Sequence, residues 1–196
     1  PIITIDGKHA LNMVTFEDVR VPADYLIVEE GKGWTYSQYL LGFERTSYAR
    51  IGGKRKQLSH IRALATAEPT GGNTKLIDDD AFARQLTDAD MAVDGLEMTV
   101  LRVLSAVKDG GSPGKEASII KILATETAQQ ITTLYLNVAA AHGQRKFEDS
   151  VSPDWTGHSD YAAPGVSTYF GARAQSIYGG TNEIQKNIIA KRVLGL

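Results

Sequence analysis

The spacing of apolar residues divides the chain into a short β-like beginning and a long helical remainder. Up to about residue 30, the pattern predicts strands over residues 2–5 and 12–16, a turn at Asp6-Gly7-Lys8, and extended chain as far as Pro22. Two or three strands alone do not form a stable sheet. Since the chain also begins with Pro1 in a strand-like run, we expect residues 1–30 to be the tail of a larger β domain, and the whole chain to be a fragment.

From Gly33 onward the apolar residues recur every three or four positions, which is the period of a helix. The pattern predicts long helices over about 33–67, 79–109 and 115–143, and two short ones over about 167–178 and 182–194. The second and third helices carry apolar stripes formed by Leu96, Val100, Val103, Leu104 and Val107, and by Ile120, Leu123, Thr127, Ile131, Leu134 and Val138. Each stripe has to be buried against another helix, so residues 31–196 are predicted to form an antiparallel helical bundle. The polar segment from Gln144 to Gly165 is predicted to be a long loop, a feature that is often functional.

Composition excludes several classes of function. The net charge of −2 leaves no basic surplus for a nucleic-acid backbone. The chain has no cysteine, which excludes disulfides, thiolate nucleophiles and cysteine-bound metals, and fits a reducing, cytoplasmic location. No apolar run is long enough to cross a bilayer, so no membrane partner is expected. No histidine has a glutamate three residues before it, so the di-iron pattern of some helical bundles is missing, and no metal site is predicted.

Glu44 is the most unusual residue of the first long helix. It shares a helical face with Leu40, Leu41, Tyr48 and Ile51, where an apolar residue would be expected. A carboxylate on such a face loses solvation, and this turns a glutamate into a useful base near neutral pH. The alternative is that Glu44 pairs with Arg45 or a neighbouring helix, or lies at the rim of the core.

Gly179-Gly180-Thr181 separates the two short helices and has two possible roles. The glycines can end one helix in a left-handed conformation while Thr181 caps the next helix. The exposed backbone N–H groups of a helix start can also receive an anion or the polar edge of a cofactor. The sequence pattern leaves both roles open.

Three motifs in order make the chain resemble the acyl-CoA dehydrogenase family over nearly its whole length. They are the stretch from Asn12 to Pro22 with Gly31-Lys-Gly-Trp34, then Leu40-Leu-Gly-Phe-Glu-Arg45, then the closing segment from Gln175 to Ala190. The chain resembles in particular bacterial members of the pimeloyl-CoA dehydrogenase large-subunit type. The resemblance implies an amino-terminal helical domain, a middle β domain and a carboxy-terminal bundle. This sequence would hold the last strands of the β domain (1–30) and the bundle (31–196).

The resemblance also implies an activity, the FAD-dependent α,β-dehydrogenation of an acyl-CoA thioester in fatty acid metabolism. A glutamate takes the α proton while the β hydrogen leaves as hydride to N5 of FAD. Most members carry this base directly after the tyrosine of the closing motif, and here that position is Gly179. A minority, including isovaleryl-type enzymes, carry it on the first bundle helix before an arginine, and here those positions are Glu44 and Arg45. Glu44 is therefore the expected catalytic base.

By the same resemblance, Gly42, Phe43 and Arg45 should line the acyl-CoA site. Tyr178, Gly179, Gly180, Thr181 and Glu183 should lie against FAD. The expected partners are an electron-transfer flavoprotein as acceptor and further subunits, in a homo- or hetero-oligomer (a dimer or tetramer) formed through the bundle. The fragment alone should be inactive.

Two alternatives share this fold. In the first, the chain is a non-catalytic helical subunit that serves oligomer formation in a mixed acyl-CoA dehydrogenase assembly. In the second, the enzyme resembles an acyl-CoA oxidase, and oxygen takes the electrons.

Overall fold

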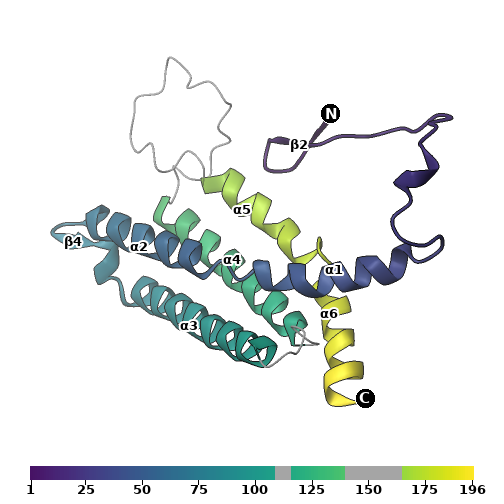
Figure 1. The fold of residues 1–196 in the computed structure, drawn as a ribbon. Coiled ribbons are helices and arrows are strands. Elements are labelled where there is room, and N and C mark those ends of the chain that lie inside the picture. Colours follow the sequence, from purple (N-terminus) through teal and green to yellow (C-terminus); the bar gives the residue numbers. More distant parts are fainter. Residues whose placement is uncertain (109–115, 140–164) are drawn as a thin grey trace.

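A bundle of α-helices makes up most of the molecule. The computed structural model describes residues 1–108, 116–139 and 165–196, without the side chains of residues 42, 43, 45, 46 and 107. Helix α4 lies at the centre and contacts each of the other α-helices in these ranges (Figure 1). The helices are α1 (Gly33–Ser47), α2 (Ile51–Ala67), α3 (Asp80–Lys108), α4 (Ala117–Ala139), α5 (Gly165–Arg173) and α6 (Asn182–Ile189). The predicted mainly α fold is confirmed.

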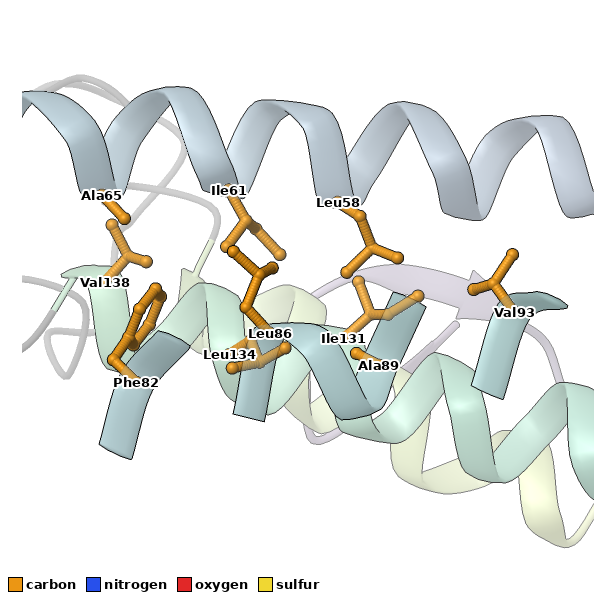
Figure 2. Close-up of a cluster of buried hydrophobic side chains, with 10 residues drawn as sticks. All are labelled: Leu58, Ile61, Ala65, Phe82, Leu86, Ala89, Val93, Ile131, Leu134 and Val138. Carbon is orange, nitrogen blue, oxygen red and sulfur yellow. The ribbon is translucent and has the colours of Figure 1, made fainter. Parts of the chain in front are cut away.

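The main core lies where α2, α3 and α4 pack together, as Figure 2 shows. Along the core, residue numbers rise in the same direction in α2 and α4 and in the opposite direction in α3. Consecutive long helices are therefore antiparallel, as predicted. The core side chains are Leu58, Ile61, Ala65, Phe82, Leu86, Ala89, Val93, Ile131, Leu134 and Val138.

A second apolar cluster links this bundle to the end of α1. It consists of the buried side chains Ala49, Leu96, Val103, Ile120 and Ala124, with Tyr48 and Ile51 packed against it. The stripes predicted for the second and third helices are confirmed by the buried residues Leu96, Val103, Ile120 and Ile131 among others. Leu104 is an exception, because half of its surface is exposed (49%).

The predicted continuous helix over 33–67 is wrong, because it is two helices. Arg50 adopts a left-handed conformation (φ 41°, ψ 46°) between α1 and α2. The Lys54 ammonium of α2 donates hydrogen bonds to the carbonyls of Tyr48 (3.3 Å) and Ala49 (2.8 Å). The end of a helix leaves carbonyls without partners, and Lys54 satisfies two of them, so the break is stabilised from the following helix.

The amino-terminal segment contains less strand than predicted. Strands β1 (Ile2–Ile3) and β2 (His9–Leu11) form an antiparallel pair with Ile2 opposite Leu11. The predicted strand over 12–16 is wrong, since these residues pair with no strand in the described part of the chain, and Met13 and Phe16 are exposed. The pairing is short because β1 has only two residues and Leu11 is already opposite the first of them, Ile2.

Short elements connect the main helices. They are the 3₁₀-helix η1 (Ala23–Tyr25), the hairpin β3 (Pro69–Gly71) and β4 (Thr74–Lys75), the 3₁₀-helices η2 (Leu76–Asp78) and η5 (Ala174–Ser176), and the π-helical η6 (Ala190–Leu194). The sequence predicted only a break at the hairpin. Of the loop predicted from Gln144 to Gly165, residues 144–164 lie outside the described residues, and Gly165 already belongs to α5. Within the described ranges, no helix has the length and apolar character needed to span a membrane.

Candidate functional site

A pocket of about 450 Å³ opens where α1 ends and α2 begins, against α4, α5 and the segment that precedes α6. A smaller pocket of about 170 Å³ shares Gln57, Thr132 and Thr168 with it. The larger pocket is lined by Glu44, Ser47, Tyr48, Arg50, Gly53, Lys54, Gln57, Ala128, Thr132, Thr168, Ala172, Gln175 and Tyr178. The predicted base and the closing segment thus meet at one cavity.

Glu44 lies at the rim of this pocket, in the last turns of α1. Its side chain is exposed, and Leu40, one turn earlier, is also exposed (65%). The predicted face is therefore open around Leu40 and Glu44, whereas Tyr48 and Ile51 pack against the second apolar cluster. The Glu44 carboxylate accepts a long hydrogen bond from the Tyr48 hydroxyl (3.4 Å). Gly42, Phe43 and Arg45 belong to the same helix, but their side chains lie outside the described residues.

Two tyrosines form the wall next to Glu44. The rings of Tyr48 and Tyr178 are tilted by 34° with centroids 6.3 Å apart. Burial raises the pKa of the Tyr48 hydroxyl, and the neighbouring Glu44 carboxylate raises it further. Burial likewise raises the pKa of the Tyr178 hydroxyl, against the opposing effect of the Arg50 guanidinium. Both phenols consequently stay protonated at neutral pH and can donate hydrogen bonds.

Cationic side chains occupy the wall where α2 begins. Lys54 is buried (5% exposed), and burial lowers the pKa of its ammonium to about 8, with the Arg50 charge acting in the same direction. Both residues line the pocket. The pocket therefore combines one carboxylate with two basic groups.

The closing segment has the backbone conformation that its glycines predict. Gly179 and Gly180 are left-handed (φ 66° and 88°), and the Thr181 hydroxyl accepts a hydrogen bond from the Ile184 N–H (3.2 Å). This confirms the Thr181 cap, but the helix predicted over 167–178 is wrong in its extent, because α5 ends at Arg173 and the 3₁₀-helix η5 lies between it and the glycine turn. The amide of the buried Gln185 donates to the Gly180 carbonyl (3.3 Å), which ties the glycine turn to α6.

The first turn of α6 is anchored to α4 by buried polar groups. The Lys121 ammonium and the Thr125 hydroxyl donate to the Asn182 side-chain oxygen at 3.0 and 3.4 Å. Glu183 is exposed, and its pKa is lowered, first by its own backbone N–H and next by the Thr181 hydroxyl. Thr181 and Glu183 are thus at the start of α6, as predicted.

Sequence reasoning did not identify Tyr48 and Lys54 as site residues. Lys54 precedes Leu58, Ile61 and Ala65 at helical spacing. A lysine on an apolar stripe is unusual, and this position could have marked Lys54 as a candidate site residue. Tyr48 offered no such signal, since an aromatic residue on an apolar face is ordinary. In the described part of the chain, no cluster of three or more histidine, aspartate or glutamate side chains could hold a metal ion.

The bundle and its closing segment define the class of the protein. Residues 31–194 match the model of the acyl-CoA dehydrogenase C-terminal domain, and the chain belongs to the acyl-CoA dehydrogenase family. It is 30% identical over 198 residues to the acyl-CoA dehydrogenase IpdE1 of Mycobacterium tuberculosis, covering 100% of this chain and 46% of that protein.

Solved structures share the fold. Butyryl-CoA dehydrogenase from Megasphaera elsdenii superposes with a TM-score of 0.72 at 22% identity, over 91% of this chain and 43% of that one. The structure of PigA with FAD and proline gives a TM-score of 0.74 at 20% identity, over 92% and 43% of the two chains. This chain spans about half the length of the curated relatives that it matches.

Proposed function

We propose that this chain is the carboxy-terminal part of an FAD-dependent acyl-CoA dehydrogenase in which Glu44 removes the α proton of the thioester. The observation that carries the proposal is the position of Glu44 at the mouth of a pocket that the closing segment also lines through Tyr178. Gly179, which follows Tyr178, has no side chain that could act as a base. Among the described residues, Glu44 is the carboxylate that lines this pocket.

The pocket suits the substrate and the base in chemical terms. The smaller adjoining pocket is lined by Ile61, Ile131 and Tyr135 among others, and offers apolar room for an acyl group. A glutamate becomes an effective general base when the closed site excludes water. In this chain Glu44 is exposed, so we propose that a further domain or subunit completes the site over α1. We expect Gly42, Phe43 and Arg45 to contribute to acyl-CoA binding there.

The residues around the glycine turn fit FAD. Gly179 and Gly180 form a left-handed turn, and the start of α6 presents N–H groups beside the Thr181 hydroxyl. We propose that Tyr178, Gly179, Gly180, Thr181 and Glu183 lie against the cofactor. When bound, FAD supplies the acceptor for the β hydrogen, which leaves as hydride to its N5 atom.

The likeness to acyl-CoA dehydrogenases also supports a set of partners. We propose an electron-transfer flavoprotein as the electron acceptor, and a dimer or tetramer formed through the bundle. A cytoplasmic location and a role in fatty acid metabolism remain predictions that follow from the family.

The test is anaerobic reduction of FAD in the complete protein by a panel of acyl-CoA thioesters. Wild type should lose its flavin absorbance with at least one thioester. Glu44→Gln should keep FAD but react at least about 100-fold more slowly, the usual contribution of a general base. Glu116→Gln, an exposed change at the start of α4, is the matched control and should react like wild type.

Equal reduction rates in wild type and Glu44→Gln would show that the base lies elsewhere. Absence of reduction with every thioester, despite bound FAD, would favour the non-catalytic assembly subunit. Rapid reoxidation by air with formation of hydrogen peroxide would indicate the oxidase-like alternative.

A further inference from the structure

Tyr48 connects the two places where a member of this family can carry its base. It follows Glu44 by one helical turn, is half-buried, and packs against Tyr178 of the closing segment. It also lines the pocket together with both residues. Tyr48 directly follows α1, and Gly179 directly follows Tyr178. The contact between the two tyrosines therefore places Tyr48 between α1 and the glycine turn.

The Tyr48 ring occupies the space that a side chain at position 179 would need. A Cβ atom added to Gly179 would lie 2.8 Å from the Tyr48 ring carbon Cζ, and closer still to the hydroxyl oxygen. Real Cβ atoms almost never approach another atom so closely. Gly180 differs, because a Cβ atom there would meet the Gln185 amide nitrogen at 2.5 Å. A side chain at 179 therefore requires Tyr48 to leave its observed position.

The same hydroxyl is hydrogen-bonded to Glu44. The Tyr48 Oη atom donates to Glu44 Oε1 at 3.4 Å. The raised pKa of Tyr48 keeps the phenol protonated, so it remains a donor at neutral and mildly alkaline pH. A donated hydrogen bond restricts the orientation of a carboxylate.

We propose that Tyr48 is the positioning residue of this site: it fills the space that a side chain at 179 would occupy and orients the Glu44 carboxylate toward the pocket. The proposal rests on the proposed role of Glu44 as the base. Glu44, Tyr48 and Gly179 then act as one unit, in which the tyrosine excludes a base from the closing segment and supports the base on α1. A tyrosine that served only as core filler would need the ring and not the hydroxyl.

The steric part is tested by a double-mutant cycle on thermal unfolding, with the complete protein and saturating FAD. Gly179→Ala should lower the unfolding midpoint by several degrees in wild type and by much less in the Tyr48→Ala background. The strain of a left-handed alanine is present in both backgrounds and cancels in the cycle. Gly180→Ala is the control: it is equally left-handed but faces Gln185, so its effect should be the same with and without Tyr48→Ala. Equal effects of Gly179→Ala in the two backgrounds would overturn the steric part.

The hydrogen-bond part is tested with Tyr48→Phe, which keeps the ring and removes the hydroxyl. Flavin reduction at saturating thioester should slow while the thioester concentration that gives half the maximal rate stays unchanged, because the Glu44 carboxylate loses the donor that orients it. Tyr169→Phe of α5, which removes a phenol hydroxyl that does not line the pocket, should leave both values unchanged. Values for Tyr48→Phe identical to those of wild type would overturn this part.

The two measurements separate this inference from the proposed function. If no thioester reduces the wild-type flavin, the role of Glu44 fails and the hydrogen-bond part fails with it. The unfolding cycle would still decide whether Tyr48 and a side chain at 179 exclude each other. If wild type is reduced but Tyr48→Phe behaves like it, the proposed function stands and Tyr48 is only a filler.

Discussion

Lys54 is a buried lysine, and its placement departs from ordinary chemistry. Lysine is rarely buried unless its charge has partners, and here the ammonium donates to two carbonyls at the end of α1. Burial lowers its pKa from 10.5 to about 8, and the nearby Arg50 guanidinium contributes. The helix break next to Glu44 thus depends on a cation that is partly destabilised by its own burial.

This placement predicts a pH-dependent stability. Between about pH 8 and pH 10.5, the unfolded chain binds more protons at Lys54 than the folded chain, so this residue makes stability rise with pH. The free energy of unfolding of wild type should therefore increase relative to Lys54→Met over this range, by up to about 1.4 kcal/mol per pH unit.

The measurement is urea unfolding at a series of pH values. Lys56→Met, an exposed change on the same helix, serves as the control and should stay parallel to wild type. Parallel curves for wild type and Lys54→Met would contradict the assigned burial of the ammonium.

Thr181 offers a second test at the scale of a single residue. Its hydroxyl caps α6 and accepts from Ile184, so Thr181→Ala should destabilise the protein by about 1 kcal/mol. Thr181→Ser keeps a hydroxyl and should restore most of the loss. Chemical denaturation measures both variants, and an equal loss in the two would show that the hydroxyl is not what stabilises this helix start.

Among the elements, the helices with one clear apolar stripe were predictable. The stripe of α4 and the acidic start of α3 predicted nearly where both helices begin, and each stripe is buried against the other long helices. The predicted ends, at 109 and 143, lie outside the described residues. The break between α1 and α2 was not predictable, since the apolar spacing continues through Tyr48 and Ile51 while Arg50 turns left-handed. The strand expected over 12–16 is wrong, because a high strand propensity does not by itself provide a neighbouring strand to pair with.

Only part of the site was predictable from the sequence, because local patterns do not show which distant segments come into contact. Glu44 stood out by its position on an apolar face, and the glycines by their turn chemistry. The contact between Tyr48 and Gly179 joins segments far apart in the sequence, so no local pattern could reveal it.

The packing of α4 against α3 predicts how much two leucines of these helices contribute to stability. Leu134 is buried in the main core, whereas Leu104 of α3 is half exposed. Leu134→Ala should reduce the free energy of unfolding by about 2–5 kcal/mol, while Leu104→Ala should cost less than about 1 kcal/mol. Denaturant titration compares the two. Similar losses would mean that the α3 surface carrying Leu104 is covered in solution.

For the molecule as a whole, the bundle is well formed whereas its amino-terminal segment is open. None of the first 48 residues contributes a fully buried side chain to either core cluster, among the residues described. Met13, Phe16 and Val28 are each at least three-quarters exposed (81%, 78% and 82%). Large exposed apolar residues close together in the sequence suggest a surface that binds other protein. That residues 1–30 are the tail of a β domain stays a prediction.

A prediction about cofactor retention follows at this scale. The isolated chain 1–196 should not retain stoichiometric FAD after gel filtration, because the cofactor would contact only the glycine turn and the start of α6 here. The complete protein should retain it. Absorbance of the protein peak near the flavin maximum measures both, and stoichiometric FAD on the isolated chain would show that the bundle alone suffices.

The central claim, that Glu44 removes the α proton, is tested most directly by hydrogen exchange. A 3-thia-acyl-CoA has sulfur in place of the β carbon, so it can lose an α proton but no β hydride. In D₂O, the complete protein should incorporate deuterium at the α carbon, as mass spectrometry detects. Glu44→Gln, with FAD still bound, should exchange at least about 100-fold more slowly. Equal exchange in the two proteins would contradict the assignment of Glu44 as the base.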